Sequence, residues 1–131
     1  MCRYVQSLIA DEVDSGIPAE RIVVSGFSQG GAVALLALRE PVKLAGVLGL
    51  SCYLPLANAP LIVSPENKAT PVLMCHGTAD PVVMFQYGEL SSQKLRGAGA
   101  NLEFEQYSGL QHAVHPQELE KVASFWQRCL A

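Results

Sequence analysis

The sequence has few charged side chains, no block of basic residues and no long apolar run. Only 16% of its 131 residues are charged, and the formal net charge is −3. A chain without a basic patch is not expected to bind nucleic acid or an anionic membrane surface. No apolar run reaches the roughly 20 residues that cross a bilayer, and no signal-peptide pattern opens the sequence. We therefore expect no transmembrane segment and no secretory signal.

Cysteine is also scarce, and its four copies lack the spacing of a metal site or a disulfide framework. They stand at positions 2, 52, 75 and 129, without a C-x-x-C pair. Cysteines scattered in this way are typical of apolar positions in a protein from a reducing compartment. We expect a cytoplasmic protein with no metal bound by these residues. Lipidation of Cys2 is a less economical alternative.

Half of the residues are hydrophobic, which a single packed domain requires. Helical and extended patterns alternate along the chain, with no internal repeat and no linker. We expect helices over 2–14, after Ser28, over 83–96 and from Pro116 onward, and strands over 22–25, 44–51, 71–75 and 101–107. This rhythm predicts an α/β fold, with a parallel sheet of about four strands covered by helices on both faces. The strand over 101–107 alternates apolar and charged residues, so we expect it near an edge.

Two of the expected helices have an apolar stripe at helical spacing. In the helix over 83–96, the residues expected to point inward are Phe85, Leu90 and Leu95. In the last helix, the stripe consists of Leu119, Val122, Ala123, Trp126, Cys129 and Leu130.

One motif with chemical meaning lies where the first expected strand meets the second helix. The segment Gly26-Phe27-Ser28-Gln29-Gly30 fits G-x-S-x-G, the sequence of a nucleophile elbow. The turn is so tight that the residues two before and two after the serine must be very small. It exposes the serine hydroxyl as a nucleophile, and the next amide, that of Gln29, can donate to an oxyanion. The alternative is a glycine-rich turn with an incidental serine.

A serine nucleophile needs a histidine base and a carboxylate that orients the histidine. After a nucleophile elbow, the carboxylate precedes the histidine along the chain. The aspartates of the sequence are Asp11, Asp14 and Asp80. Only Asp80 follows Ser28, and it comes just after the carboxyl end of an expected strand. We therefore predict Asp80 as the orienting carboxylate.

Three histidines compete for the role of the base. His76 precedes Asp80 and so breaks the expected order; packing or hydrogen bonding at a strand end would explain it. His115 stands next to Pro116 at a helix start, as a capping residue would. His112 lies in the turn between the last strand and the last helix, from which it can reach over the sheet. We predict a triad of Ser28, His112 and Asp80.

The segment from 52 to 70 shows no period, yet it is rich in apolar residues. A loop of this length in a compact domain is often functional, and it follows the carboxyl end of a strand, where open α/β sheets bind ligands. We predict that Tyr53, Leu54 and Leu56 line a pocket for an acyl chain. A surface loop that packs over its own core is an equal alternative.

Together these motifs resemble the phospholipase/carboxylesterase family of α/β-hydrolases, which includes acyl-protein thioesterases. The resemblance rests on Gly26–Gly31, on His76-Gly77 with Asp80–Val83, on Gly109 with His112, and on Ser51–Leu56. It implies hydrolysis of carboxylic esters or thioesters without metal or cofactor, with S-palmitoyl-proteins, lysophospholipids or short esters as substrates. It also implies Val82 as a substrate-binding residue. A different α/β-hydrolase, of the lipase or dienelactone-hydrolase type, is the rival enzyme.

The chain departs from this family at its amino end. Family members have further strands there and a loop with a second oxyanion donor, so we expect residues 1–131 to be the carboxyl-terminal portion of one truncated α/β-hydrolase domain. The strand over 22–25 should then lie at an open edge of the sheet, which permits self-association or a second chain. The chain is accordingly expected to be a serine esterase or thioesterase; alternatively, it is a weakly active or inactive module that binds acyl groups or a partner.

Overall fold

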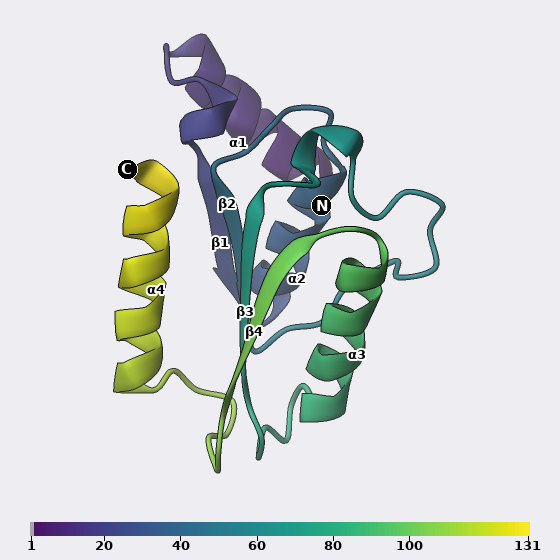
Figure 1. Ribbon diagram of the computed structural model, residues 1–131, viewed down its shortest axis with the longest axis vertical. Coiled ribbons are helices and arrows are strands. Elements are labelled where there is room, and N and C mark those ends of the chain that lie inside the picture. The colour runs from purple at the N-terminus through teal and green to yellow at the C-terminus, as the bar shows by residue number, and fades with distance from the viewer. Residues whose placement is uncertain (1) are drawn as a thin grey trace.

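The computed structural model describes residues 2–131, which form four helices and four strands (Figure 1). The strands are β1 (Val23–Phe27), β2 (Gly46–Leu50), β3 (Pro71–Gly77) and β4 (Asn101–Tyr107). The helices are α1 (Cys2–Asp14), α2 (Gln29–Leu36), α3 (Phe85–Gly97) and α4 (Pro116–Leu130). Short 3-10 turns lie at Ala19–Arg21, Ala37–Arg39 and Pro65–Asn67.

All four strands are parallel and follow one another across the sheet in the order β1-β2-β3-β4. Figure 1 shows the sheet nearly edge-on, with α4 on one face and α1, α2 and α3 on the other. The expected α/β fold, a parallel four-stranded sheet between helices, is therefore confirmed. Within the described residues, β1 and β4 are the two edge strands, as expected for both segments.

Alternating residues of the central strands point into two apolar cores. The larger core lies under α1, α2 and α3, and its central strand residues are Val47, Val72 and Met74. The smaller core lies under α4, and its central strand residues are Leu48, Leu50, Leu73 and Cys75. Burial on both faces explains why the sequence of β2 is apolar without alternation.

Several expected details are wrong. β1 ends at Phe27 and β3 continues to Gly77, so His76 belongs to a strand. Leu90 was expected to point inward, yet it is 56% exposed because it lies on the side of α3 that faces a cavity. The buried residues of α4 are Glu118, Val122 and Phe125. Of the expected stripe, only Val122 is buried and Cys129 is half-buried. The other members of the stripe are exposed: Leu119, Ala123, Trp126 and Leu130.

The long segment between β2 and β3 is held in place by a buried asparagine side chain. The Nδ2 atom of Asn67 donates to the carbonyl oxygens of Glu40 (3.0 Å) and Val42 (2.9 Å). Its Oδ1 atom accepts from the backbone amide of Leu44 at 3.0 Å. Asn67 is fully buried, so these bonds replace its contacts with water and fix the segment against the start of β2.

Among the helices of residues 2–131, none has the length and apolar character that crossing a bilayer requires. Cys52, Cys75 and Cys129 carry free thiols. The side chain of Cys2, considered above for lipidation, lies outside what the structure describes.

Candidate active site

The G-x-S-x-G segment forms a sharp turn between β1 and α2, with Ser28 at its apex. The backbone of Ser28 has φ 56° and ψ −120°, a conformation that non-glycine residues rarely adopt. Its amide donates to the carbonyl oxygen of Leu50 at 2.8 Å, which ties the turn to the end of β2. As the first residue of α2, Gln29 carries a backbone N–H that has no acceptor within the helix.

The expected need for small residues on both sides of the serine holds for Gly26 and not for Gly30. A Cβ atom on Gly26 would lie 2.2 Å from the Gly30 carbonyl, so strand and helix meet there without room for a side chain. A Cβ atom on Gly30 would meet nothing within 4 Å. The expectation for Gly30 is wrong because its missing side chain would point away from β1. Gly31, which the pattern did not single out, is needed because its Cβ would lie 2.9 Å from that of Cys52.

A turn after β3 holds the carboxylate of Asp80. Its Oδ1 atom accepts the backbone amides of Val82 and Val83, both at 2.9 Å. The side chain has no exposed surface. Burial alone would raise the pKa of Asp80, but hydrogen bonds from His112 and from these two amides outweigh it and lower the pKa. The carboxylate is therefore ionised and keeps one oxygen, Oδ2, for another donor.

His112 lies in the loop between β4 and α4, and this loop is bound to the turn that holds Asp80. The amide of Ala79 donates to the carbonyl oxygen of Leu110 (3.0 Å), and the amide of Gly109 donates to the hydroxyl of Thr78 (2.8 Å). The imidazole packs on the ring of Phe27 at a centroid distance of 4.9 Å. These contacts fix the position of the loop and of the His112 imidazole.

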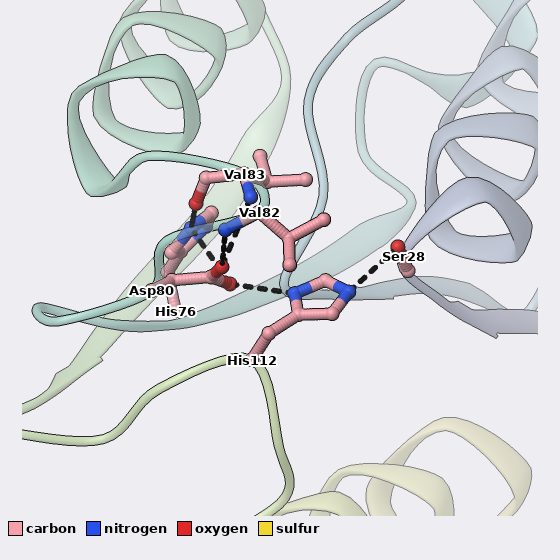
Figure 2. Close-up of polar contacts among 6 residues, drawn as sticks. All are labelled: Ser28, His76, Asp80, Val82, Val83 and His112. Carbon is pink, nitrogen blue, oxygen red and sulfur yellow. Dashed lines mark hydrogen bonds and ion pairs between the residues drawn. The ribbon is translucent and has the colours of Figure 1, made fainter.

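The three side chains meet above the carboxyl ends of the strands, as Figure 2 shows. The Nδ1 atom of His112 lies 2.7 Å from Oδ2 of Asp80, and its Nε2 atom lies 2.9 Å from Oγ of Ser28. A carboxylate only accepts hydrogen bonds, so Nδ1 carries the hydrogen and Nε2 can accept the serine proton. The His112 side chain is 17% exposed. The arrangement can therefore act on a molecule that approaches from solvent.

The other histidines lie apart from Ser28. His115 caps α4: its Nδ1 atom accepts the amide of Gln117 at 3.0 Å, and its own amide donates to Glu118. His76 is fully buried near the end of β3, with Nε2 only 2.7 Å from the carbonyl oxygen of Val83. The sequence alone did not predict which residues these two histidines would contact.

Another nucleophile near the elbow is the thiol of Cys52. Its sulfur lies against Gly31 and Gly49, and the side chain is buried. Burial raises the pKa of Cys52 to about 12, so the thiol keeps its proton and stays unreactive at neutral pH.

A cavity of about 960 Å³ opens beside the Asp80 turn. Three of the residues expected to bind substrate line it: Tyr53, Leu54 and Val82. The fourth, Leu56, is not among the residues that line this cavity; it is 65% exposed, and its backbone has φ 54°. The sequence reasoning missed the wall that α3 contributes, with Tyr87, Leu90 and Ser91. The apolar residues Tyr87 and Leu90, which lie three positions apart and so on one side of α3, are the signal that could have found it.

Comparisons with known proteins place these features in a family. The chain is 46% identical over 126 residues to a protein named acyl-protein thioesterase 1 from Neurospora crassa, covering 93% of this chain and 51% of that protein. It is 44% identical over 132 residues to a protein of the same name from Gibberella zeae, covering 98% of this chain and 56% of that one. The chain thus spans about half the length of the curated relatives it matches.

Solved structures agree with the fold. The crystal structure of Arabidopsis thaliana SOBER1 superposes with a TM-score of 0.93 at 34% identity, over 99% of this chain and 63% of that one. Zea mays acyl-protein thioesterase 2 gives a TM-score of 0.82 at 32% identity, over 95% and 63% of the two chains. The family model described as Phospholipase/Carboxylesterase matches residues 1–130. The chain therefore belongs to the phospholipase/carboxylesterase family of α/β-hydrolases.

Proposed function

We propose that the chain is a serine hydrolase that cleaves carboxylic esters or thioesters through an acyl-enzyme on Ser28. The observation that carries this proposal is the continuous row from Ser28 Oγ through His112 to Asp80, with separations of 2.9 and 2.7 Å. The names of its relatives, acyl-protein thioesterases, support the same class of reaction. We propose further that residues 1–131 are the carboxyl-terminal portion of a single α/β-hydrolase domain.

In the acylation step, Nε2 of His112 takes the proton as the Ser28 oxygen attacks the carbonyl carbon of the substrate. Asp80 stabilises the imidazolium that forms and keeps its Nδ1–H oriented. The tetrahedral intermediate bears its negative charge on the former carbonyl oxygen, and the Gln29 amide is the proposed donor to it. The intermediate then expels the alcohol or thiol, which takes the proton from His112. The acyl group remains on Ser28.

Deacylation repeats these steps with water. His112 removes a proton from the water as it attacks the acyl carbon, and returns the proton to Ser28 as the carboxylic acid leaves. None of these steps uses a metal or a cofactor. In relatives of this family a second donor usually joins the one after the serine, and removing one donor typically costs about 10²–10³ in turnover.

The cavity supports a substrate with an apolar acyl chain. Its lining includes Val82 and Val83, whose amides bind Asp80, so it begins beside the triad. Its volume of about 960 Å³ lies at the upper end of ligand pockets. We propose S-acylated proteins as substrates, with lysophospholipids and short esters as further ones. The free thiols of Cys52, Cys75 and Cys129 fit a cytoplasmic location.

A second candidate function is binding without turnover. The cavity, together with β1 as an edge strand, favours a module that holds acyl groups or associates with a partner or a second copy through that edge. In this case Ser28 would not be acylated at a useful rate.

A fluorophosphonate probe separates the two candidates, because it labels only an activated serine. We expect the wild-type chain to be labelled at Ser28, and labelling to disappear in Ser28→Ala and in His112→Ala. His115→Ala is the matched control, since this histidine caps α4 and should leave labelling intact. No labelling of a folded wild-type chain would refute the hydrolase and favour the binding module. Rates on palmitoyl-thioesters, lysophospholipids and short p-nitrophenyl esters would then rank the substrates.

A further inference from the structure

We propose that His76 is a positioning residue for the triad, which holds the turn from residue 80 to residue 83 so that the Asp80 carboxylate can bind His112. The inference rests on the proposed hydrolase function. It adds a buried side chain that touches neither the substrate nor the reacting atoms.

His76 donates one hydrogen bond to this turn. It is fully buried in β3, and its Nε2 atom lies 2.7 Å from the carbonyl oxygen of Val83 (Figure 2). A carbonyl oxygen only accepts hydrogen bonds, so Nε2 carries the hydrogen and the neutral ring has a bare Nδ1. The tautomer is thus set by the turn.

Val83 passes this restraint to the carboxylate. While its carbonyl accepts from His76, its amide donates to Oδ1 of Asp80 at 2.9 Å, beside the amide of Val82. Two donors fix Oδ1, which leaves Oδ2 directed at His112. The Nε2 atom of His76 lies 3.6 Å from Oδ2, too far for a hydrogen bond. His76 therefore acts on Asp80 through Val83.

Helix α3 holds the imidazole of His76 in place. A Cβ atom on Gly88 would lie 2.3 Å from Nδ1 of His76, so only glycine fits beside the ring. The Phe85 ring and the imidazole pack in a T-shaped arrangement, with 5.9 Å between centroids and 81° between planes. Nδ1 is buried without a hydrogen-bond partner in the described structure, which costs stability. The hydrogen bond that Nε2 donates to Val83 accounts for a histidine at this position despite the unpaired Nδ1.

Two substitutions of His76 test the role of the donor. Gln places an N–H near the position of Nε2, whereas Phe keeps the ring and removes the donor. We expect His76→Phe to lower kcat for a short p-nitrophenyl ester by about 10²-fold, counted per serine titrated with fluorophosphonate, at nearly unchanged KM. His76→Gln should recover most of the loss. Equal kcat per titrated serine in His76→Phe and wild type would overturn the proposal.

A second pair of variants tests the same role without touching His76. Gly88→Ala pushes a methyl group into the imidazole. Its control is Glu89→Ala on the same helix, at an exposed position that does not line the cavity. We expect the kcat of Gly88→Ala to fall and that of Glu89→Ala to stay at the wild-type level. If His76→Phe does not fold, this pair decides the question. Equal kcat in Gly88→Ala and Glu89→Ala would contradict the proposal.

The low-field proton resonance of His112 Nδ1–H reports the bond to Asp80 and needs no turnover. It should be present in the wild type and in Glu89→Ala, and weakened or shifted upfield in His76→Phe and Gly88→Ala. An unchanged resonance in both of the latter would overturn the positioning role alone. A normal resonance in a wild-type chain that fluorophosphonate fails to label would count against the hydrolase function alone.

Discussion

Gly77 and Leu110 bring the end of β3 into direct contact with the His112 loop: a side-chain carbon at residue 77 would lie 2.1 Å from the Leu110 carbonyl oxygen. The same oxygen accepts the amide of Ala79 at 3.0 Å. The loop that carries the base and the turn that carries the carboxylate therefore share one backbone contact. Their distance depends on the absence of a side chain at residue 77.

Gly77→Ala should separate Asp80 from His112. The methyl group has to push Leu110 away, which we expect to lower kcat by about 10²-fold and the free energy of unfolding by about 1–3 kcal/mol. Kinetics with a short ester and urea unfolding measure the two effects. The control is Glu89→Ala, at an exposed position of α3 that does not line the cavity. Wild-type kcat in Gly77→Ala would show that this contact does not set the geometry.

The elbow offers a matched pair of glycines. Gly26→Ala places a methyl group 2.2 Å from the Gly30 carbonyl, and neither backbone can yield without opening the turn. We expect this variant to lose about 3 kcal/mol or more of unfolding free energy, together with its labelling by fluorophosphonate. Gly30→Ala meets nothing within 4 Å and should stay folded and labelled. Equal stability of the two variants would contradict the geometry of the turn.

Asp80→Asn should lower kcat by about 10⁴-fold, because a neutral amide neither stabilises the imidazolium nor fixes the tautomer of His112.

The same substitution should also change the stability of the fold in acid. The pKa of Asp80 is lowered in the folded state from its ordinary value of 3.8. The ionised carboxylate thus stabilises the fold above pH 3.8, and this contribution is lost as the pH falls through the lowered pKa of the folded state. Urea unfolding of both proteins over the acid range should show a smaller pH dependence in Asp80→Asn; identical curves would exclude this contribution.

Glu118 should give the opposite pH dependence. It is fully buried under α4, where burial raises its pKa above 4.5 although the amide of His115 acts against this. Cys75 and Tyr107 lie near it; burial raises the pKa of each, and a negative charge on Glu118 raises it further. Below pH 4.5 the carboxyl is neutral in both the folded and the unfolded state. As the pH rises from 4.5 to the raised pKa of the folded state, stability falls by about 1.4 kcal/mol for each pH unit.

Glu118→Gln cannot ionise and should remove this decline. Urea unfolding between mild acid and neutral pH should give a flatter stability profile for the variant than for the wild type. Glu120→Gln, on the exposed face of the same helix, is the control and should keep the wild-type profile. A wild-type protein whose stability does not fall over this range would show that Glu118 is not neutralised by burial.

Substitutions at the cavity should separate long from short substrates. Leu90→Trp fills part of the cavity, so we expect KM for a palmitoyl-thioester to rise about tenfold while kinetics with a short ester stay unchanged. Leu119→Trp is the control, because Leu119 is 58% exposed, close to the 56% of Leu90, yet lies on α4 away from the cavity. Equal effects on both substrates would indicate that the acyl chain binds elsewhere.

Local signals predicted the fold and the placement of three site residues. Three of the strands are short apolar runs, β4 alternates apolar and charged residues, and helical patterns flank most of them. This arrangement identifies a parallel sheet without tertiary information. Ser28 is identified by the glycines around it. Asp80 and His112 follow because aspartate and histidine are rare here: chain order excludes Asp11, Asp14 and His76, and the place of His115 at a helix start sets it aside. The structure brings Ser28, Asp80 and His112 together, while their catalytic roles remain proposals.

Features that depend on the rotation of a helix could not be predicted. Helix α4 has more apolar residues than one helix face can bury. The sequence alone therefore does not show which of them face the sheet, as Val122 does, and which face solvent, as Leu119 does. For the same reason, the sequence did not show that Leu90 lines the cavity. Gly88 carries no signal of its own, because its role depends on an imidazole twelve residues earlier on another element. The sequence also does not show that Leu56 lies outside the cavity, because the positive φ of its backbone has no sequence signature.

The contact between Trp126 and Ser25 gives this protein an optical reporter at the sheet edge. The indole N–H donates to the Ser25 hydroxyl at 3.1 Å, and this is the single tryptophan of the sequence. Its ring is 45% exposed beside β1. Any polypeptide that adds to that strand will change the polarity around the only indole, so emission wavelength and quenching follow such an event directly, without a dye.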